Sequence, residues 1–519
     1  MIDNSKDLMG DALNFELKDT LSFGKLGFEK ESLRVFQSNI AKSAHPRSVG
    51  SALCNQYITT DFSEAQLELI TPPLSGKTSS FEFLDHIHHF VSHNIGQEIL
   101  WPFSMPPVIT SEHDIPIANF GTSNLGLFKQ IYRNGLAHRY GRAMQAISGV
   151  HYNYSLPDSI WQTSLFKDED KRDIKEIKSK AYFRMLRNVY RMNWLILYLF
   201  GASPVLAENC IKKDKSSCQR LDDQTYYLPY ATSLRMSDYG YQNLLRTSLN
   251  ISFNSLNDYI FDLRAATSTA SKAFQKIDNK HLTHQKQINA NVLQIEDEYY
   301  AAARAKSRII SNQRPTSKLI QGGVDYIELR SLDLNPFSRI GIDMETVYFL
   351  EMFLIYCLLK PSKPISSDEL STIHDNDLLV AKFGRDPNLY LQKYQTKIGL
   401  KEWGNQILDE ITPIAELLDG DTTVYSEMIG AIKLKVNNPD ETLSGLLLDR
   451  IMTEKISFID LGNSIGAANK QYYLNLEKSG NLHWHLLEQE AKDSWDRQFK
   501  LEEDTSQPFE NFVTDYFNE

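Results

Sequence analysis

Residues 26–35 read Leu-Gly-Phe-Glu-Lys-Glu-Ser-Leu-Arg-Val. In an extended chain successive side chains point to opposite faces, so Gly27, Glu29, Glu31 and Leu33 fall on the same face. The stretch therefore predicts a β-strand that presents two carboxylates on one side. It decides the fold because later segments of the chain repeat the same alternation.

Four further segments alternate between polar and apolar residues. They are residues 62–70, with Glu64, Gln66 and Glu68 on one face; residues 148–156, with His151 and Asn153; residues 249–254, with Asn250 and Ser252; and residues 324–332, with Tyr326, Glu328 and Arg330. Strands with one polar face are typical of an antiparallel sheet that has helices behind it, whereas buried parallel strands are apolar throughout. We therefore predict an α+β fold, with the open polar face as the candidate active site.

Helical periodicity is clearest in residues 81–95, 181–200 and 343–359. The most apolar short run, residues 194–202, is too short to span a bilayer and follows three arginines, so it predicts a buried helix.

Strand signals fade after about residue 364. We expect a catalytic sheet-and-helix core over residues 1–365 and a mainly helical part over residues 366–519 that packs on the same core. The acidic stretch 488–519 is expected at the periphery.

The composition is that of a globular protein with a large core: 519 residues, 42% hydrophobic and 11% aromatic. The net charge of −11 disfavours nonspecific nucleic-acid binding, which needs a basic surface. Four cysteines without a CxxC pair argue against structural zinc and favour a reduced cytosolic protein. Residues 1–20 lack the basic and apolar regions of a signal peptide.

Carboxylates on the predicted polar face are candidate metal ligands. Glu29 and Glu31 would repel each other on one strand face, and a divalent cation would remove that repulsion; a solvated face is the alternative. Glu328 beside Arg330 fits either a simple salt bridge or a site where the guanidinium fork grips phosphate. His151 fits either a structural hydrogen bond or a ligand.

Several other patterns are poor evidence for a site. Residues 75–78 resemble the end of a phosphate-binding loop, but Thr71 replaces the required glycine. His86, His89 and His93 fall near one helical face, and without neighbouring cysteines or carboxylate pairs an ordinary helix surface is favoured over a transition-metal site. Neither GxGxxG nor HExxH occurs, and the sequence offers no convincing protein nucleophile and no nicotinamide site.

Six stretches are far more specific together than alone. They are residues 27–35, 101–106 (Trp-Pro-Phe-Ser-Met-Pro), 140–153 (Tyr-Gly-Arg-Ala-Met-Gln-Ala-Ile-Ser-Gly-Val-His-Tyr-Asn), 227–238 (Tyr-Leu-Pro-Tyr-Ala-Thr-Ser-Leu-Arg-Met-Ser-Asp), 294–296 (Gln-Ile-Glu) and 326–337 (Tyr-Ile-Glu-Leu-Arg-Ser-Leu-Asp-Leu-Asn-Pro-Phe). In this order they resemble the glutamate–cysteine ligases of the gammaproteobacterial type.

The resemblance implies a curved, mainly antiparallel sheet of the glutamine-synthetase-like superfamily, with helices packed on the convex face. It implies ATP-dependent ligation of L-cysteine to the γ-carboxylate of L-glutamate through γ-glutamyl phosphate, the first step of glutathione biosynthesis. That route activates the substrate's own carboxylate and needs no protein nucleophile. The alternative is a related carboxylate–amine ligase with a different amine acceptor.

The resemblance also implies particular ligands. Mg²⁺, with Mn²⁺ as the alternative ion, would be held by Glu29, Glu31, Asp61, Glu68, His151 and Glu328. The implied catalytic residues are Glu328 and Arg330, with Arg330 near the transferred phosphoryl group. The implied amino-acid pocket is lined by Tyr132, Gln145, Ala146, Ile147, Arg235, Tyr241 and Tyr300.

Residues 301–306 lack the prolines that family members often carry there, so a nucleotide role for Arg304 or Lys306 does not carry over.

The expected partners are L-glutamate, L-cysteine and ATP, without nucleic acid or membrane, in a cytoplasmic monomer open to feedback inhibition by glutathione. A non-catalytic binding protein on this fold would have lost metal ligands, and none is lost.

Overall fold

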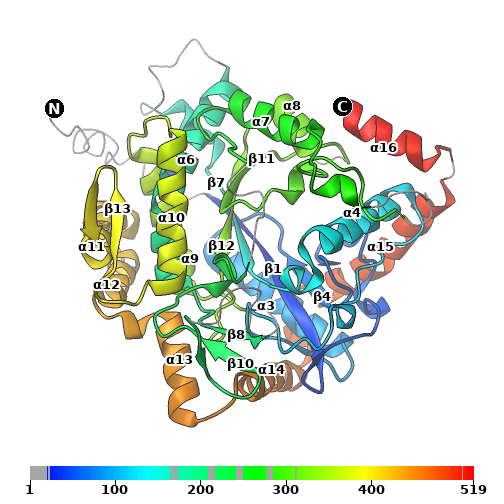
Figure 1. Cartoon of the computed structure of the whole chain (residues 1–519), viewed down its shortest axis with the longest axis horizontal. Helices are drawn as coiled ribbons and strands as arrows, with labels where there is room; N and C mark the ends of the chain where they lie inside the picture. The colour runs from blue at the N-terminus through cyan, green and yellow to red at the C-terminus, as the bar shows by residue number, and fades with distance from the viewer. Residues whose placement is uncertain are drawn as a thin grey trace.

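The computed structural model describes residues 20–21, 24–163, 166, 173–208, 217–240, 249–277, 285–309, 312–504 and 506–519. Within them a nine-stranded antiparallel sheet forms the centre (Figure 1). Its main path runs β11 (Ala303–Lys306), β12 (Tyr326–Leu332), β7 (Val150–Ser155), β1 (Lys25–Phe36), β4 (Gln66–Ile70) and β3 (Ile58–Thr60). Three short strands, β2 (Asn39–Ile40), β5 (Leu74–Ser75) and β6 (Ile99–Leu100), also pair with β1.

Strand register brings the predicted polar residues onto one face. Glu29 of β1 lies opposite His151 of β7, and Glu31 lies opposite Glu68 of β4. On the far side of β7, Glu328 of β12 lies opposite Asn153. The predicted strands over 26–35, 148–156 and 324–332 are thus confirmed, and the one over 62–70 is confirmed for its second half.

The other face of the sheet is apolar and covered by helices α3 (Lys77–Asn94), α6 (Ile174–Phe200) and α9 (Met344–Leu359) (Figure 1). The strand residues that point to it are fully buried, and they are Phe28, Leu67, Leu69, Val150, Tyr152, Ile327 and Leu329. Each buried side chain of this size stabilises the fold by roughly 1.5–3 kcal/mol. This packing holds β1, β4, β7 and β12 in place under the polar face.

The remaining elements surround this core. Helices α4 (Asn124–Tyr140), α5 (Arg142–Gln145), α7 (Leu256–Ser268) and α8 (Pro315–Gly322) precede α9, together with a small sheet of β8 (Val205–Ala207), β9 (Gln219–Arg220) and β10 (Thr225–Tyr227). No helix in the described part of the chain is long and apolar enough to cross a membrane.

Beyond residue 366 the described chain is helical apart from one hairpin, β13 (Tyr390–Lys393) with β14 (Thr396–Gly399). The helices are α10 (Ser367–Phe383), α11 (Leu400–Asp419), α12 (Val424–Asn437), α13 (Leu443–Glu454), α14 (Phe458–Leu474), α15 (Trp484–Glu503) and α16 (Phe509–Asn518). The division into parts 1–365 and 366–519 stays a prediction.

The strand predicted over residues 249–254 is wrong, because this segment pairs with no strand among the residues that the structure describes. Its backbone is satisfied by side chains instead: Arg187 donates to the carbonyls of Phe253 and Asn254, and Asp262 accepts from the amide of Ser252. Ile251 and Phe253 alternate inward because they pack into the core, not because a sheet continues there.

We predicted an ordinary solvated helix surface for the histidines of α3, and this prediction is wrong. These histidines lie in an interface with α14 and α15. His89 is 3% exposed, and its ring lies 5.4 Å from that of Trp484. His86 Nδ1 lies 2.7 Å from Nδ1 of His483.

Candidate active site

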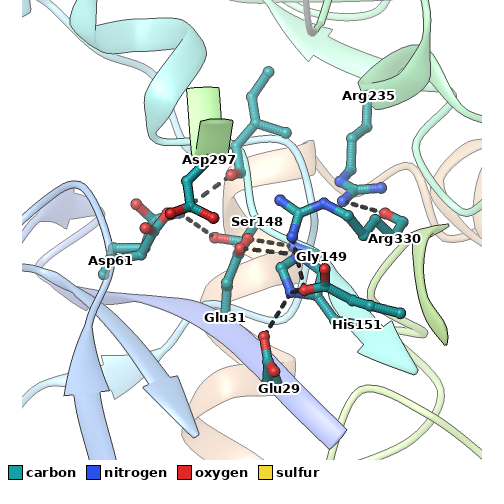
Figure 2. Close-up of polar contacts among 12 residues, drawn as sticks. Glu29, Glu31, Asp61, Ser148, Gly149, His151, Arg235, Asp297 and Arg330 are labelled. Atoms are coloured by element: carbon teal, nitrogen blue, oxygen red, sulfur yellow. Dashed lines mark hydrogen bonds and ion pairs between the residues drawn. The ribbon is translucent and has the colours of Figure 1, made fainter. Parts of the chain in front are cut away.

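The polar face gathers three potential ligands of a cation at its centre. Ligand atoms of Glu29, Glu68 and His151 all lie within 4.8 Å of one another. Figure 2 shows Glu29 and Glu31 pointing from β1 toward His151 on β7. Alternation along each strand and the register between strands place these side chains together.

His151 links three carboxylates, two from β1 and one from β12. Its Nδ1 lies 3.0 Å from Glu29 Oε2 and 3.3 Å from Glu328 Oε1, and its Nε2 lies 3.6 Å from Glu31 Oε1. Glu31 also accepts a hydrogen bond of 2.9 Å from the backbone amide of Gly149. The amide of Asn153 donates to Glu29 Oε1 at 2.9 Å, so both carboxylates of β1 are held in fixed orientations.

Two cations flank Glu328. Arg330, two residues along the same strand, donates from Nη1 to Glu328 Oε1 at 2.9 Å. Lys306 of β11 places its Nζ 3.4 Å from Glu328 Oε2. The Arg304 side chain is used differently, since it pairs with the backbone of Asp297 and Tyr299. The structure thus brings Lys306 to the site and gives Arg304 a structural contact.

The carboxylates divide into two electrostatic classes. Burial, together with the nearby charges of Glu29, Asp61 and Glu31, raises the pKa of Glu68 to about 8, and burial raises the pKa of Glu31. Burial also acts to raise the pKa of Glu328, but Lys306 and Arg330 outweigh it and hold the pKa well below its usual range.

For Glu29 burial is likewise outweighed, here by the hydrogen bond with His151, and its pKa is lowered. For His151 burial and Arg330 favour the neutral ring, but hydrogen bonds to Glu29 and Glu328 raise its pKa to about 9. Without a cation, His151 therefore carries the proton that balances the cluster.

These residues fit a divalent cation. Carboxylates that raise each other's pKa indicate negative charge in excess of the local positive charge, which a cation would neutralise. The donor set is mainly carboxylate oxygen, as Mg²⁺ prefers, with one imidazole. Binding through His151 would require this ring to lose its proton.

Asp61 lies at the edge of this group. Its side chain is 42% exposed, and Oδ1 lies 3.7 Å from Nη2 of Arg133 on α4. It stands at the end of β3 and contributes negative charge to Glu31 and Glu68. The predicted ligand set is therefore present as an inner group with Asp61 at its rim.

A cavity of about 70 Å³ adjoins Arg330 and includes two predicted substrate residues, Arg235 and Tyr300. The guanidinium of Arg235 donates to the backbone carbonyl of Arg330 at 3.0 Å (Figure 2). Position 149 must be glycine for this packing, because an added Cβ would lie 2.2 Å from Arg235 Nη2. Tyr300 donates to Gln145 Oε1 at 2.8 Å.

The other predicted substrate residues are placed differently. Gln145 is buried, and its Nε2 has no hydrogen-bond partner in the described structure. Ala146 and Ile147 are buried within a core cluster, so their side chains support the wall from behind. Tyr132 lines a second, larger cavity. Tyr241 lies outside the described residues.

The larger cavity has a volume of about 820 Å³ and adjoins the carboxylate cluster. Glu29, Asn153 and Lys306 line it near the cluster. Its apolar lining residues include Leu125, Phe128, Ile295, Leu319, Phe512 and Tyr516. Sequence reasoning set Lys306 aside and did not consider Phe512 and Tyr516, the two residues of α16 that line this cavity. The alternation of residues 303–306 could have indicated Lys306, but no local signal links α16 to the sheet.

Comparisons with known proteins show which family the chain resembles. The family model described as glutamate-cysteine ligase matches residues 12–380. Proteins named glutamate–cysteine ligase are similar in sequence: one from Alcanivorax borkumensis is 39% identical over 98% of each chain, and one from Shewanella oneidensis is 40% identical over 95% of this chain and 94% of its own. A crystal structure of glutamate–cysteine ligase from Francisella tularensis in complex with AMP is 33% identical, with a TM-score of 0.89 over 95% of this chain and 97% of that one.

Proposed function

The chain belongs to the glutamate–cysteine ligase family, and from this we propose that it joins L-cysteine to the γ-carboxylate of L-glutamate while ATP becomes ADP and phosphate. The product, γ-glutamylcysteine, is the first intermediate of glutathione biosynthesis. We further propose that the sheet is the curved sheet of the glutamine-synthetase-like superfamily, with its helices on the convex face.

One observation carries the assignment of the site. Glu29 belongs both to the group of potential cation ligands and to the lining of the 820 Å³ cavity. Such a cavity is within the range that takes a ligand of nucleotide size. A nucleotide there would have its phosphates beside the carboxylate cluster and Lys306.

We assign Glu29, Glu31, Glu68, His151 and Glu328 to holding Mg²⁺, with Asp61 at the rim. When bound, the ion would neutralise phosphate charge and orient the phosphate oxygens. Mn²⁺ is the alternative ion, since both accept oxygen donors.

Two cations of this chain are placed to act on the transferred phosphoryl group. Arg330 is oriented by Glu328, and a planar guanidinium fork matches the oxygens of a phosphate. Lys306, which lies on β11, is also held by Glu328. In the reaction, a γ-carboxylate oxygen of glutamate attacks the terminal phosphorus of ATP and ADP leaves. These side chains stabilise the charge on the equatorial oxygens.

The second half-reaction takes place on the acyl carbon. The neutral amine of cysteine attacks the acyl carbon of γ-glutamyl phosphate. Phosphate leaves with the oxygen that bridged carbon and phosphorus, and the amine nitrogen loses a proton. Arg235 and Tyr300 line the neighbouring small cavity, and Gln145 is hydrogen-bonded to Tyr300. We propose that these side chains orient the amino acids by hydrogen bonds. Ala146, Ile147, Tyr132 and Tyr241 complete the proposed pocket.

The test of this function is ADP release from the purified protein. We expect release to require both L-glutamate and L-cysteine, and a Glu328→Gln variant to lose at least about 10²-fold in kcat while its thermal unfolding stays cooperative. If glycine or α-aminobutyrate supports the same rate as cysteine, the acceptor is a different amine. Release without glutamate would refute the function.

The remaining features rest on family resemblance alone. We propose a cytoplasmic monomer with feedback inhibition by glutathione, which chemically contains the product of this reaction.

A further inference from the structure

The C-terminal helix α16, at the red end of the chain in Figure 1, contributes side chains to the lining of the larger cavity. Phe512 and Tyr516 lie one helical turn apart and therefore on one face. Both line the cavity, and both contact Phe128 of α4, with ring centroids 5.9 Å and 4.7 Å away. The acidic stretch 488–519 therefore reaches the region next to the active site, although we expected it at the periphery.

Polar contacts tie the end of α16 to the α7–α8 region. Arg314 donates to the carbonyl of Phe517 at 3.1 Å, and Arg264 and Ser317 donate to the carbonyl of Glu519 at 3.2 and 3.1 Å. Arg314 is itself paired with buried Glu296 at 2.8 Å. Cations and donors at a helix C-terminus stabilise the carbonyls that the helix leaves free.

These contacts hold a helix that is weak by itself. An isolated helix of ten residues is unstable in water, so tertiary contacts must maintain it. No residue of α16 is fully buried. Phe512 and Tyr516 are partly exposed because one side of each faces the cavity.

The cavity lining includes two chemically different groups of residues. Glu29 and Lys306 belong to the carboxylate cluster on the sheet, whereas Phe512 and Tyr516 belong to α16 and pack on Phe128. A nucleotide has the same asymmetry, with anionic phosphates at one end and a flat base at the other. Phosphates placed at the sheet would direct the base to α16.

We propose that α16 forms the base-binding wall of the nucleotide site, with the rings of Phe512 and Tyr516 against the base. The inference rests on the proposed function, since it needs the nucleotide in this cavity. It has a second consequence: the base and α16 bind to each other, so nucleotide binding and helix docking reinforce one another.

The first experiment compares nucleotide with a ligand that has phosphates and no base. In the full chain, Tyr516→Ala and Phe512→Ala should each raise the KM for ATP roughly tenfold, since loss of base stacking has an effect of this size. Inhibition by inorganic tripolyphosphate should keep the same Ki. Tyr516→Phe retains the ring and should restore the KM, and Asn518→Ala, on the exposed side of α16, is the matched control.

Lys306→Ala separates the two hypotheses. If it raises the KM for ATP while both aromatic variants leave it unchanged, the cavity holds nucleotide and the role of α16 is wrong. If all three variants leave it unchanged, the nucleotide cavity itself is wrong. An equal weakening of ATP and tripolyphosphate by the aromatic variants would also overturn base recognition.

A second measurement uses the unmodified protein. ADP should slow hydrogen exchange of the amides of residues 509–518, and tripolyphosphate at equal occupancy should not. Exchange slowed equally by both ligands, or by neither, would overturn the proposal.

Discussion

Glu31 of β1 and Glu68 of β4 face each other directly across an antiparallel strand pair. Side chains in this relation have Cβ atoms about 4.5–5.5 Å apart, and like charges there are destabilising. Burial and mutual repulsion raise the pKa of Glu68 to about 8. The sheet thus stores an electrostatic conflict that a bound divalent cation would relieve.

A Glu68→Gln substitution should act in opposite directions with and without the ion. In chelator at neutral pH, Glu68 must take up a proton when the chain folds, and glutamine avoids this cost, so the free energy of unfolding should rise by about 1 kcal/mol or more. In the assay, the Mg²⁺ concentration for half-maximal rate should rise at least about tenfold, because a ligand is lost. Urea unfolding and Mg²⁺ titration measure the two effects.

Glu82→Gln on the exposed side of α3 is the control and should change neither quantity. A Glu68→Gln enzyme with an unaltered Mg²⁺ requirement would remove Glu68 from the ligand set.

Arg330→Lys keeps the charge but removes the planar fork. Arg330 uses one guanidinium nitrogen on Glu328, and a lysine ammonium cannot hold that carboxylate and grip phosphate with the same geometry. We expect kcat to fall about 10²–10³-fold, with the KM for ATP changed much less. Steady-state kinetics with the exposed Arg339→Lys as control tests this. A rate within threefold of the parent enzyme contradicts the role.

The stability of the fold should decline with acid through His88. Burial, reinforced by Lys30, holds the pKa of His88 well below its usual range. The unfolded chain, with a histidine pKa of about 6.5, therefore binds a proton that the folded chain does not, and stability is lost as the pH falls below about 6.5. This group contributes a slope of up to about 1.4 kcal/mol per pH unit.

Unfolding free energies of His88→Gln between pH 7 and pH 5 should show a shallower slope than those of the parent. A His485→Gln change, at an exposed histidine, should leave the slope as it is in the parent protein. Equal slopes in His88→Gln and the parent protein would show that His88 is not kept neutral.

Two glycines in C-terminal helices should respond oppositely to alanine. At Gly462 of α14 an added Cβ would lie 2.2 Å from the fully buried Trp101 ring, whose indole nitrogen is fixed by the Met105 carbonyl. Gly462→Ala should therefore destabilise by about 1–3 kcal/mol. At Gly430 of α12 an added Cβ meets nothing within 4 Å, and alanine should stabilise by about 0.5–1 kcal/mol. Thermal and urea unfolding of both variants measures the two changes in stability. Changes of the same sign would contradict this packing.

Local alternation was reliable where one strand face is buried. β1, β7 and β12 were predicted with the correct faces because Phe28, Tyr152 and Leu329 must point into the core, and this leaves their neighbours on the other side. The same signal failed at residues 249–254. There Ile251 and Phe253 pack inward as well, but side chains satisfy the backbone and no strand pairs with it.

Local signals did not place at the site the residues that reach it from other elements. Lys306 meets Glu328 only because β11 pairs with β12 in one register. Phe512 and Tyr516 are nearly 500 residues from β1 along the chain and lie beside the cavity through tertiary packing of α16.

The sequence by itself determined which side chains share a strand face, because side-chain direction in an extended chain depends only on position, and its motifs determined the family. Only the tertiary structure decided that Glu31 meets Glu68, that His151 bridges three carboxylates, and that Phe512 and Tyr516 of α16 line the cavity. Those relations depend on strand order, register and helix docking, which follow from the packing of distant apolar surfaces and not from any one segment.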